Sequence, residues 1–290
     1  MRSTVLYNSL KSKIPPGLVS LINFLNSRVD PIAISFYKMK TGWSKPIPPL
    51  ELRRITSKRS IDDYVKSGER IVKSFTDGLN SIGTDINEIK SVLDFGCGAG
   101  RQIQYFYDYK NLKITGCDPN EDHIKWLTSQ YPLASFSLSQ FDPPLPFKDE
   151  DFDLIYSVSV FTHLSEKAQF NWLEELKRIL RPGGLALITT LGEHAAECAD
   201  KNKSSQRDRN EPEIFSQALS EQKFLFYVPE SYRQVNKVIN PTSISDDEMY
   251  GIAWHSQEYI ANNWSKYFEI VKIISGCIDS LQDLVILRKL

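Results

Sequence analysis

The sequence predicts an α/β fold of the doubly wound type, with a seven-stranded sheet that is parallel except for its last strand. From residue 91 onward, strand-length apolar runs alternate with helix-length segments, which is typical of parallel βαβ units. The last two apolar runs, 268–274 and 284–287, are joined by a connection too short for a crossover helix. We therefore expect these two strands to be antiparallel neighbours.

The remaining elements are predicted from the periodicity of apolar residues and from residues that begin or end helices. Helices are expected over residues 61–80 and 166–180, where apolar residues recur at helical spacing. The second follows Ser165 and ends at the turn Arg181-Pro182-Gly183-Gly184. The other five strands are expected at apolar runs 92–95, 114–117, 135–138, 154–158 and 185–189.

Two segments fall outside this alternation. Residues 1–60 combine an apolar helical pattern at 18–25 with a proline-rich loop at 45–49, and we expect an N-terminal helical cap or lid. Residues 61–290 form the second predicted domain, which carries an insertion after the fifth strand at about 193–253. We expect this insertion to lie above the sheet.

Composition and charge exclude several classes of protein. The 290 residues are 41% hydrophobic and 24% charged, as in an ordinary globular protein. The net charge is −1, so we expect no nucleic-acid partner. Four scattered cysteines without C-x-x-C spacing predict no metal site and a reducing, cytoplasmic location.

The N-terminus bears on membrane association. No window reaches the roughly 18 apolar residues of a membrane span, and no signal-peptide pattern is present, so no stable membrane insertion is expected. Because Lys11, Lys13 and Arg28 flank the apolar pattern, a basic amphipathic segment on a membrane surface is the alternative. Asn23 and Asn26 dilute that pattern.

The sharpest motif is an apolar strand that runs directly into a glycine-rich turn. Gly96, Gly98 and Gly100 let backbone approach a ligand where a Cβ would clash, and amides of the following helix can point at it. A second strand ends at Asp118, about twenty residues on, where such folds bind a ribose diol. Arg101 stands where the dinucleotide-binding fingerprint needs a small residue, which disfavours an oxidoreductase.

The triplet Gly96-x-Gly98-x-Gly100 resembles the first motif of class I S-adenosylmethionine-dependent methyltransferases, which have a Rossmann-like fold. Three later segments resemble that family in the same order: Asp118, the stretch 145–155, and the turn 180–184. The antiparallel tail also agrees with the family. The resemblance covers roughly residues 60–290 and is strongest in 91–191.

The resemblance implies S-adenosyl-L-methionine as methyl donor, S-adenosyl-L-homocysteine as product, and no metal. Asp94 would support the loop or touch the donor, and Asp118 would take the ribose hydroxyls. At the end of the third strand, Phe141 occupies the position where the family often has an acid. The resemblance therefore does not identify the residue that binds the adenine amine. The implied donor-binding residues are Asp94, Gly96, Cys97, Gly98, Gly100, Asp118, Pro119, Gln140, Phe141 and Ser159.

If the acceptor is an alcohol its proton must be removed, and two histidines are candidates for the base. The alternatives are that the enzyme positions the acceptor without a base and that these histidines are structural. His163 follows the fourth strand, and His255 follows the insertion. Arg101 lies on a helix surface, braces an acid or contacts substrate. Aromatic side chains can wall an acceptor pocket, although core packing is the usual role of such residues. The acceptor-site candidates are Tyr64, Arg101, Phe161, Tyr250 and Trp254.

We expect the acceptor to be a small molecule. The run 159–165 and the ending 282–285 resemble bacterial methyltransferases of sugars, glycan precursors or specialised metabolites, which favours O-methylation. N- or C-methylation of another metabolite is the alternative. A nucleic-acid methylase is disfavoured, because Asp142-Pro143-Pro144-Leu145 precedes the fourth strand and lacks the final aromatic residue. A homodimer is one option for the assembly.

Overall fold

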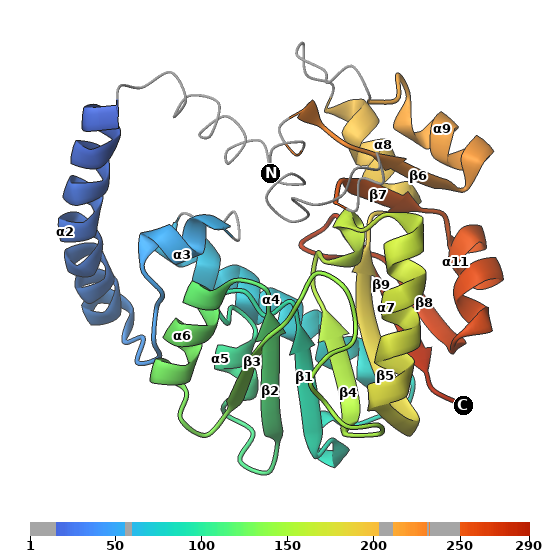
Figure 1. Cartoon of the computed structure of the whole chain (residues 1–290), viewed down its shortest axis with the longest axis horizontal. Helices are drawn as coiled ribbons and strands as arrows, with labels where there is room; N and C mark the ends of the chain where they lie inside the picture. Colours follow the sequence, from blue (N-terminus) through green and yellow to red (C-terminus); the bar gives the residue numbers. More distant parts are fainter. Residues whose placement is uncertain (1–15, 56–59, 203–210, 231, 233–249) are drawn as a thin grey trace.

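The computed structural model describes residues 16–55, 60–202, 211–230, 232 and 250–290, with backbone alone for 16–27 and 55. A seven-stranded sheet of order β3-β2-β1-β4-β5-β9-β8 forms its centre (Figure 1). The first five strands are parallel, and β9 lies antiparallel between β5 and β8, which confirms the predicted sheet. The strands are β1 Ser91–Phe95, β2 Lys113–Asp118, β3 Ser135–Leu138, β4 Phe152–Ser157, β5 Leu180–Thr190, β8 Glu269–Ile278 and β9 Gln282–Arg288.

Helices cover both faces of this sheet. Helices α4, α5 and α6 share one apolar cluster with one face, and α7 and α11 share another with the opposite face. The described helices are α2 Pro16–Thr41, α3 Leu50–Ile55, α4 Ile61–Asn80, α5 Ile103–Phe106, α6 Glu121–Gln130, α7 Glu166–Ile179, α8 Glu193–Lys201, α9 Phe215–Gln222 and α11 Gln257–Asn263, with short 3₁₀ turns η1 Ile86–Glu88, η2 Phe161–His163 and η3 Trp264–Lys266.

Helix α4 matches the predicted helix 61–80. It begins after Ser60, whose hydroxyl accepts a hydrogen bond from the Asp63 backbone N–H and so satisfies one of the free donors of the first turn. Its fully buried Phe75 and Leu79 face the sheet, and each contributes about 1.5–3 kcal/mol through the apolar surface removed from water. The helix thereby fixes the side of the sheet beside the glycine turn.

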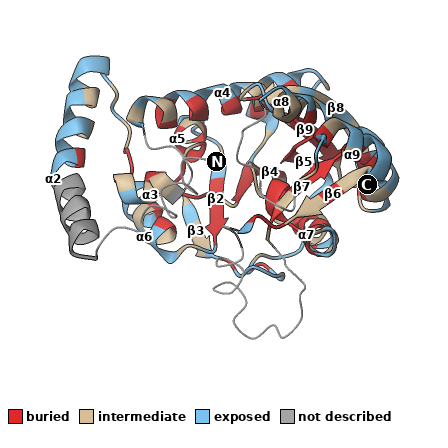
Figure 2. Cartoon of the chain, turned by 90° about the horizontal axis from the view of Figure 1, so that it is seen from above, coloured by how far each residue is buried: buried red, intermediate tan, exposed pale blue. Residues whose placement is uncertain are grey.

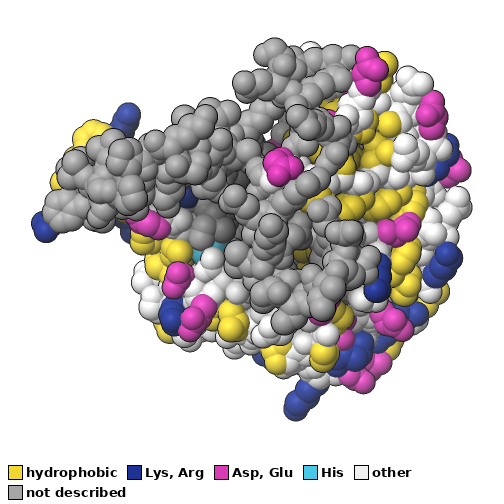
Figure 3. Space-filling model, turned by 45° about the horizontal axis from the view of Figure 1, so that its top comes forward, with side chains coloured by type: hydrophobic (Ala, Val, Ile, Leu, Met, Phe, Trp, Pro, Cys, Tyr) yellow, Lys and Arg dark blue, Asp and Glu magenta, His cyan; other side chains and the backbone are white. Residues whose placement is uncertain are grey.

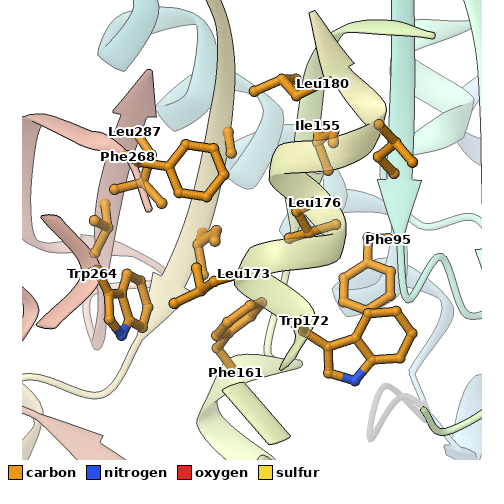
Figure 4. Packing of buried hydrophobic residues seen from close by; sticks show 14 of the residues in the cluster. Phe95, Ile155, Phe161, Trp172, Leu173, Leu176, Leu180, Trp264, Phe268 and Leu287 are labelled. Carbon is orange, nitrogen blue, oxygen red and sulfur yellow. The ribbon is translucent and has the colours of Figure 1, made fainter. Parts of the chain in front are cut away.

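Helix α7 supplies the core of the opposite face. Its buried Trp172 packs on Phe95 of β1, and Leu173 lies on the side of Phe161 and Trp264 (Figure 4). The helix ends at Ile179, and the segment predicted as a turn continues directly into β5. That extension forms because the Gly183 N–H donates to the Lys289 carbonyl and the Lys289 N–H donates to the Gly184 carbonyl.

The described part of the region between β5 and β7 contains α8, α9 and a hairpin of β6 Phe224–Tyr227 with β7 Ile252–His255. Its apolar residues form a separate cluster, which includes Trp254 and Phe215. Before α4, α2 is tied to α3 by a buried ion pair between Asp30 and Arg53, with 2.6 Å between Oδ1 and Nη2. Within the described residues, no helix combines the length and apolar character that crossing a membrane requires.

Candidate active site

The glycine loop, residues 96–100, connects the end of β1 to the segment leading into α5. Gly96 and Gly100 have φ values of +81° and +80°, in the left-handed region that glycine adopts most readily. A Cβ on Gly96 would lie 2.4 Å from Val160 Cγ2, and one on Gly100 would lie 2.4 Å from Leu127 Cδ2. Both conformation and packing therefore require glycine at these two positions.

Asp118 ends β2 and faces this loop. Its Oδ2 accepts the Gly98 backbone N–H at 2.8 Å, and its Oδ1 accepts the Asn120 N–H at 2.8 Å. The two strands pair in parallel, with Phe95 opposite Cys117, so both carboxyl ends reach the same edge of the sheet. The structure thus places the carboxylate beside the loop, as the sequence predicted, with 8% of the residue exposed.

His123 is a residue of this site that the sequence did not single out. It lies in the first turn of α6, is 2% exposed, and has its Nδ1 3.3 Å from Asp118 Oδ1. Its buried Nε2 has no hydrogen-bond partner among the described residues, so this nitrogen can still accept or donate a hydrogen bond. A histidine five residues after an acid gives no such signal in sequence.

Asp94 lies inside β1 beneath the loop. The Tyr156 hydroxyl of β4 donates to its Oδ2 at 2.9 Å, across the register that pairs the two residues. Burial raises the pKa of Asp94 to about 8, and the Tyr156 hydrogen bond and the Arg101 charge oppose this rise. Asp94 is therefore bound to β4 just before the loop, and its raised pKa favours the protonated carboxyl.

Tyr64 and Arg101 were predicted near the acceptor, and the structure shows hydrogen bonds between α4 and the segment 99–101 that involve both side chains. The Tyr64 hydroxyl donates to the Ala99 carbonyl at 2.8 Å, and 1% of the residue is exposed. Arg101 Nη1 donates to Ser67 Oγ at 3.3 Å. A Cβ on Gly68 would lie 2.3 Å from the Arg101 carbonyl oxygen, so α4 approaches the loop closely. Both side chains brace the loop on α4.

Ser159 follows β4 and joins three strands at the same edge. Its φ is +59°, and its N–H donates to Thr189 Oγ1 of β5 at 2.8 Å. Gln282 of β9 donates from Nε2 to Ser159 Oγ at 2.8 Å. Hydrogen bonds to β5 and β9 hold this strained residue in place, and Val160 next to it packs on Gly96.

The other predicted donor-binding residues divide into exposed and buried ones. Pro119, Gln140 and Phe141 are exposed and follow the ends of β2 and β3. Cys97 is 3% exposed, and its side chain packs against Gly116 of β2. It can therefore offer its backbone to a ligand at the loop, whereas its thiol faces the sheet.

His163 and Tyr250 form an aromatic cluster with Tyr232. His163 Nδ1 lies 2.8 Å from the Gly251 carbonyl, and its ring stacks on Tyr250 with 5.0 Å between centroids. Burial lowers the pKa of His163, which favours the neutral imidazole. Burial raises the pKa of Tyr250, and the charges of Tyr232 and Asp118 add to the rise.

His255, Phe161 and Trp254 were predicted at the acceptor, and the structure places all three in apolar cores. His255 is fully buried, has Nε2 2.8 Å from Gln169 Oε1, and has a pKa lowered by burial to about 3. Phe161 packs on Trp264, and Trp254 packs on Phe215. Hydrophobic burial decided these positions, and we propose no acceptor role for them.

Comparisons with known proteins agree with this geometry. Residues 93–188, from β1 through most of β5, match the model of a methyltransferase domain. The matched segment contains the glycine loop, Asp118 and His163. The family match covers these residues alone, so this part of the chain is similar to a methyltransferase domain, and it lies in a sheet of the doubly wound type.

Individual relatives share part of the chain. A fatty-acid O-methyltransferase of Mycolicibacterium smegmatis is 36% identical over 104 residues, which cover 35% of this chain and 37% of that protein. The methyltransferase GfsG of Streptomyces halstedii is 25% identical over 138 residues, covering 46% of this chain and 47% of that protein. The chain therefore spans less than half the length of these two relatives.

Solved structures show the same fold. A Pyrococcus horikoshii protein superposes with a TM-score of 0.51 at 15% identity, covering 79% of this chain and 95% of its own. An S-adenosylmethionine-dependent methyltransferase of Mesorhizobium loti superposes with a TM-score of 0.50 at 13% identity, covering 74% and 97% respectively. At these identities the likeness concerns the fold.

Proposed function

We propose that this chain transfers the methyl group of S-adenosyl-L-methionine to an oxygen atom of a small molecule. A sugar or glycan precursor or a specialised metabolite is the acceptor class that we propose, in a cytoplasmic setting. The observation that carries the proposal is the hydrogen bond between the Gly98 N–H and Asp118, because it joins a glycine-rich loop to a carboxylate at the neighbouring strand end.

The residues at this edge fit an adenosyl donor. The loop backbone at Gly98 lies beside Asp118, whose carboxylate oxygens are suited to a ribose diol. The unpartnered His123 Nε2 supplies a further polar atom beside Asp118. Phe141 follows β3 and is 40% exposed, so its aromatic ring can stack on a base.

When bound, the donor supplies an activated methyl group on a positively charged sulfur. The protein has to orient the acceptor and remove its proton if the acceptor atom is a hydroxyl oxygen. His163 suits proton removal, because the neutral ring keeps a lone pair on Nε2 when its Nδ1–H is directed to the Gly251 carbonyl. We propose His163 as that base and the ring of Tyr250 as part of the acceptor site.

Two of the relatives favour oxygen as the acceptor atom. They are the fatty-acid O-methyltransferase and a chloroplastic tocopherol O-methyltransferase of Arabidopsis thaliana, 32% identical over 108 residues. N- or C-methylation is the second candidate. A tRNA N(3)-methylcytidine methyltransferase of Drosophila melanogaster is 30% identical over 115 residues, but the net charge of −1 makes a polyanionic acceptor less favourable.

Calorimetry with S-adenosyl-L-homocysteine tests donor binding first. We expect saturable binding at one site per chain, and no binding at millimolar ligand would overturn the proposal. A screen of sugars, phenols, fatty acids and short RNAs with methyl-labelled donor then identifies the acceptor. Label found on nitrogen, on carbon or in RNA would refute O-methylation while leaving donor binding intact.

A further inference from the structure

Helix α2 carries an exposed apolar stripe. Val29, Ile32, Phe36 and Met39 are 59%, 69%, 60% and 76% exposed. Their spacing of three and four residues places them within about 80° of arc on one side of the helix. Large apolar side chains gathered on one exposed face mark an interaction surface.

The opposite side of α2 is attached to the body. Asp30 is 8% exposed and binds both Arg53 and the Leu50 backbone N–H, and the Tyr37 hydroxyl donates to Asp62 at 3.4 Å. The helix lies at one edge of the molecule, and most of its described length is exposed (Figure 2). The apolar stripe therefore faces outward while polar contacts hold the helix in place.

The charge of this region differs from that of the rest of the chain. Residues 1–41 contain six basic residues and one acid, Asp30, for a net charge of +5. The remaining residues contain 29 basic and 35 acidic residues, for a net charge of −6, from 35 minus 6 and 36 minus 1. Acidic side chains are scattered over the body of the molecule (Figure 3). The positive charge is thus concentrated in the segment that carries the stripe.

We propose that α2 lies on an anionic lipid surface, with the stripe 29–39 among the lipid chains and the basic residues at the phosphates. An apolar helix face bordered by Lys and Arg is the pattern of an interfacial helix. Pairing with a second copy is disfavoured, because two such helices would bring their basic residues together and the acid Asp30 is already bound to Arg53. The proposal goes beyond the proposed function and does not depend on it.

Vesicle flotation of the full chain tests the proposal. The double variant Ile32→Ser and Phe36→Ser removes two exposed apolar side chains, and the exposed Leu133→Ser, at 86%, is the matched control on another surface. We expect binding to mixed phosphatidylglycerol and phosphatidylcholine vesicles, weaker binding in high salt, and a loss of about tenfold or more in the double variant. The control should bind as the unmodified chain does.

Three results would overturn the proposal. They are no binding to anionic vesicles, equal binding by the double variant, and a dimer in light scattering that the double variant converts to monomer. The last would assign the stripe to a second copy. Thermal unfolding is measured on the same samples, and an unchanged midpoint in the double variant shows that the fold is unaffected.

Discussion

Replacing Asp118 by asparagine tests the donor site most sharply, because the change keeps the size of the side chain and removes its charge. In the structure both oxygens of Asp118 are acceptors, Oδ2 for the Gly98 N–H and Oδ1 for the Asn120 N–H, each at 2.8 Å. An asparagine amide has one accepting atom, so one of these N–H groups would face an NH₂ group. The loop loses a bond in either orientation of the amide.

The expected magnitude follows from these bonds. Hydrogen bonds to a charged partner contribute about 1.5–3 kcal/mol, and a buried donor left without an acceptor costs about 1–3 kcal/mol. If asparagine forfeits one charge-assisted bond to the ribose, about 2 kcal/mol of binding free energy is lost, which raises Kd about 30-fold. The free energy of unfolding should fall by about 1–3 kcal/mol.

Calorimetry with S-adenosyl-L-homocysteine measures the affinity change, and urea titration measures the stability change. Asp122→Asn is the matched control, since Asp122 is an exposed acid in the first turn of α6, four residues after Asp118. The control should alter neither quantity. An Asp118→Asn protein that is folded and binds within about threefold of the unmodified chain would refute the assigned role of this carboxylate.

Three further predictions concern the loop and the histidines. Gly100→Ala should lower the free energy of unfolding by about 2–4 kcal/mol, because the left-handed φ and the contact with buried Leu127 both oppose a Cβ. Gly83 has a φ of +77° and open space around it, so Gly83→Ala should cost about 1–2 kcal/mol. Equal losses for the two variants in denaturant titrations would contradict this. The pKa of Asp94 is raised from 3.8 to about 8, so its contribution to stability is present below the unfolded pKa and is lost as pH rises toward 8, at up to about 1.4 kcal/mol per pH unit. Asp94→Asn should flatten the pH dependence of the urea midpoint in this window, and parallel curves for the two proteins would reject the raised pKa. His163→Ala should lower turnover at saturating donor and leave the donor affinity unchanged, whereas His255→Ala should mainly lower thermal stability. A folded His163→Ala enzyme with full turnover would refute the proposal that His163 is the base.

The backbone of the fold was predictable from sequence because local signals and global topology agree. The helix over 61–80 and the antiparallel tail both follow from spacing, and the structure confirms them. The prediction was wrong at residues 180–184, where β5 begins at Leu180. Hydrogen bonds between Gly183, Gly184 and Lys289 form this extension, and a contact more than a hundred residues distant has no local signature.

The parts of the site that depend on a fixed spacing of residues in the sequence were predictable. The parts that depend on tertiary packing were not. Glycine spacing and the following acid placed Gly98 and Asp118 together correctly. The same reasoning could not show that His255 is enclosed by aromatic rings or that His123 turns toward Asp118. Both outcomes depend on which side chains cover the histidine, and that information is contained in tertiary contacts.

A crystal structure of the chain with S-adenosyl-L-homocysteine bound is the most direct test of the donor site. We predict both ribose hydroxyls within hydrogen-bond distance of the Asp118 carboxylate, with the amino-acid part of the ligand along residues 96–100. Density for the ligand at another place, or at this loop with Asp118 turned away from the ribose, would contradict the proposed function.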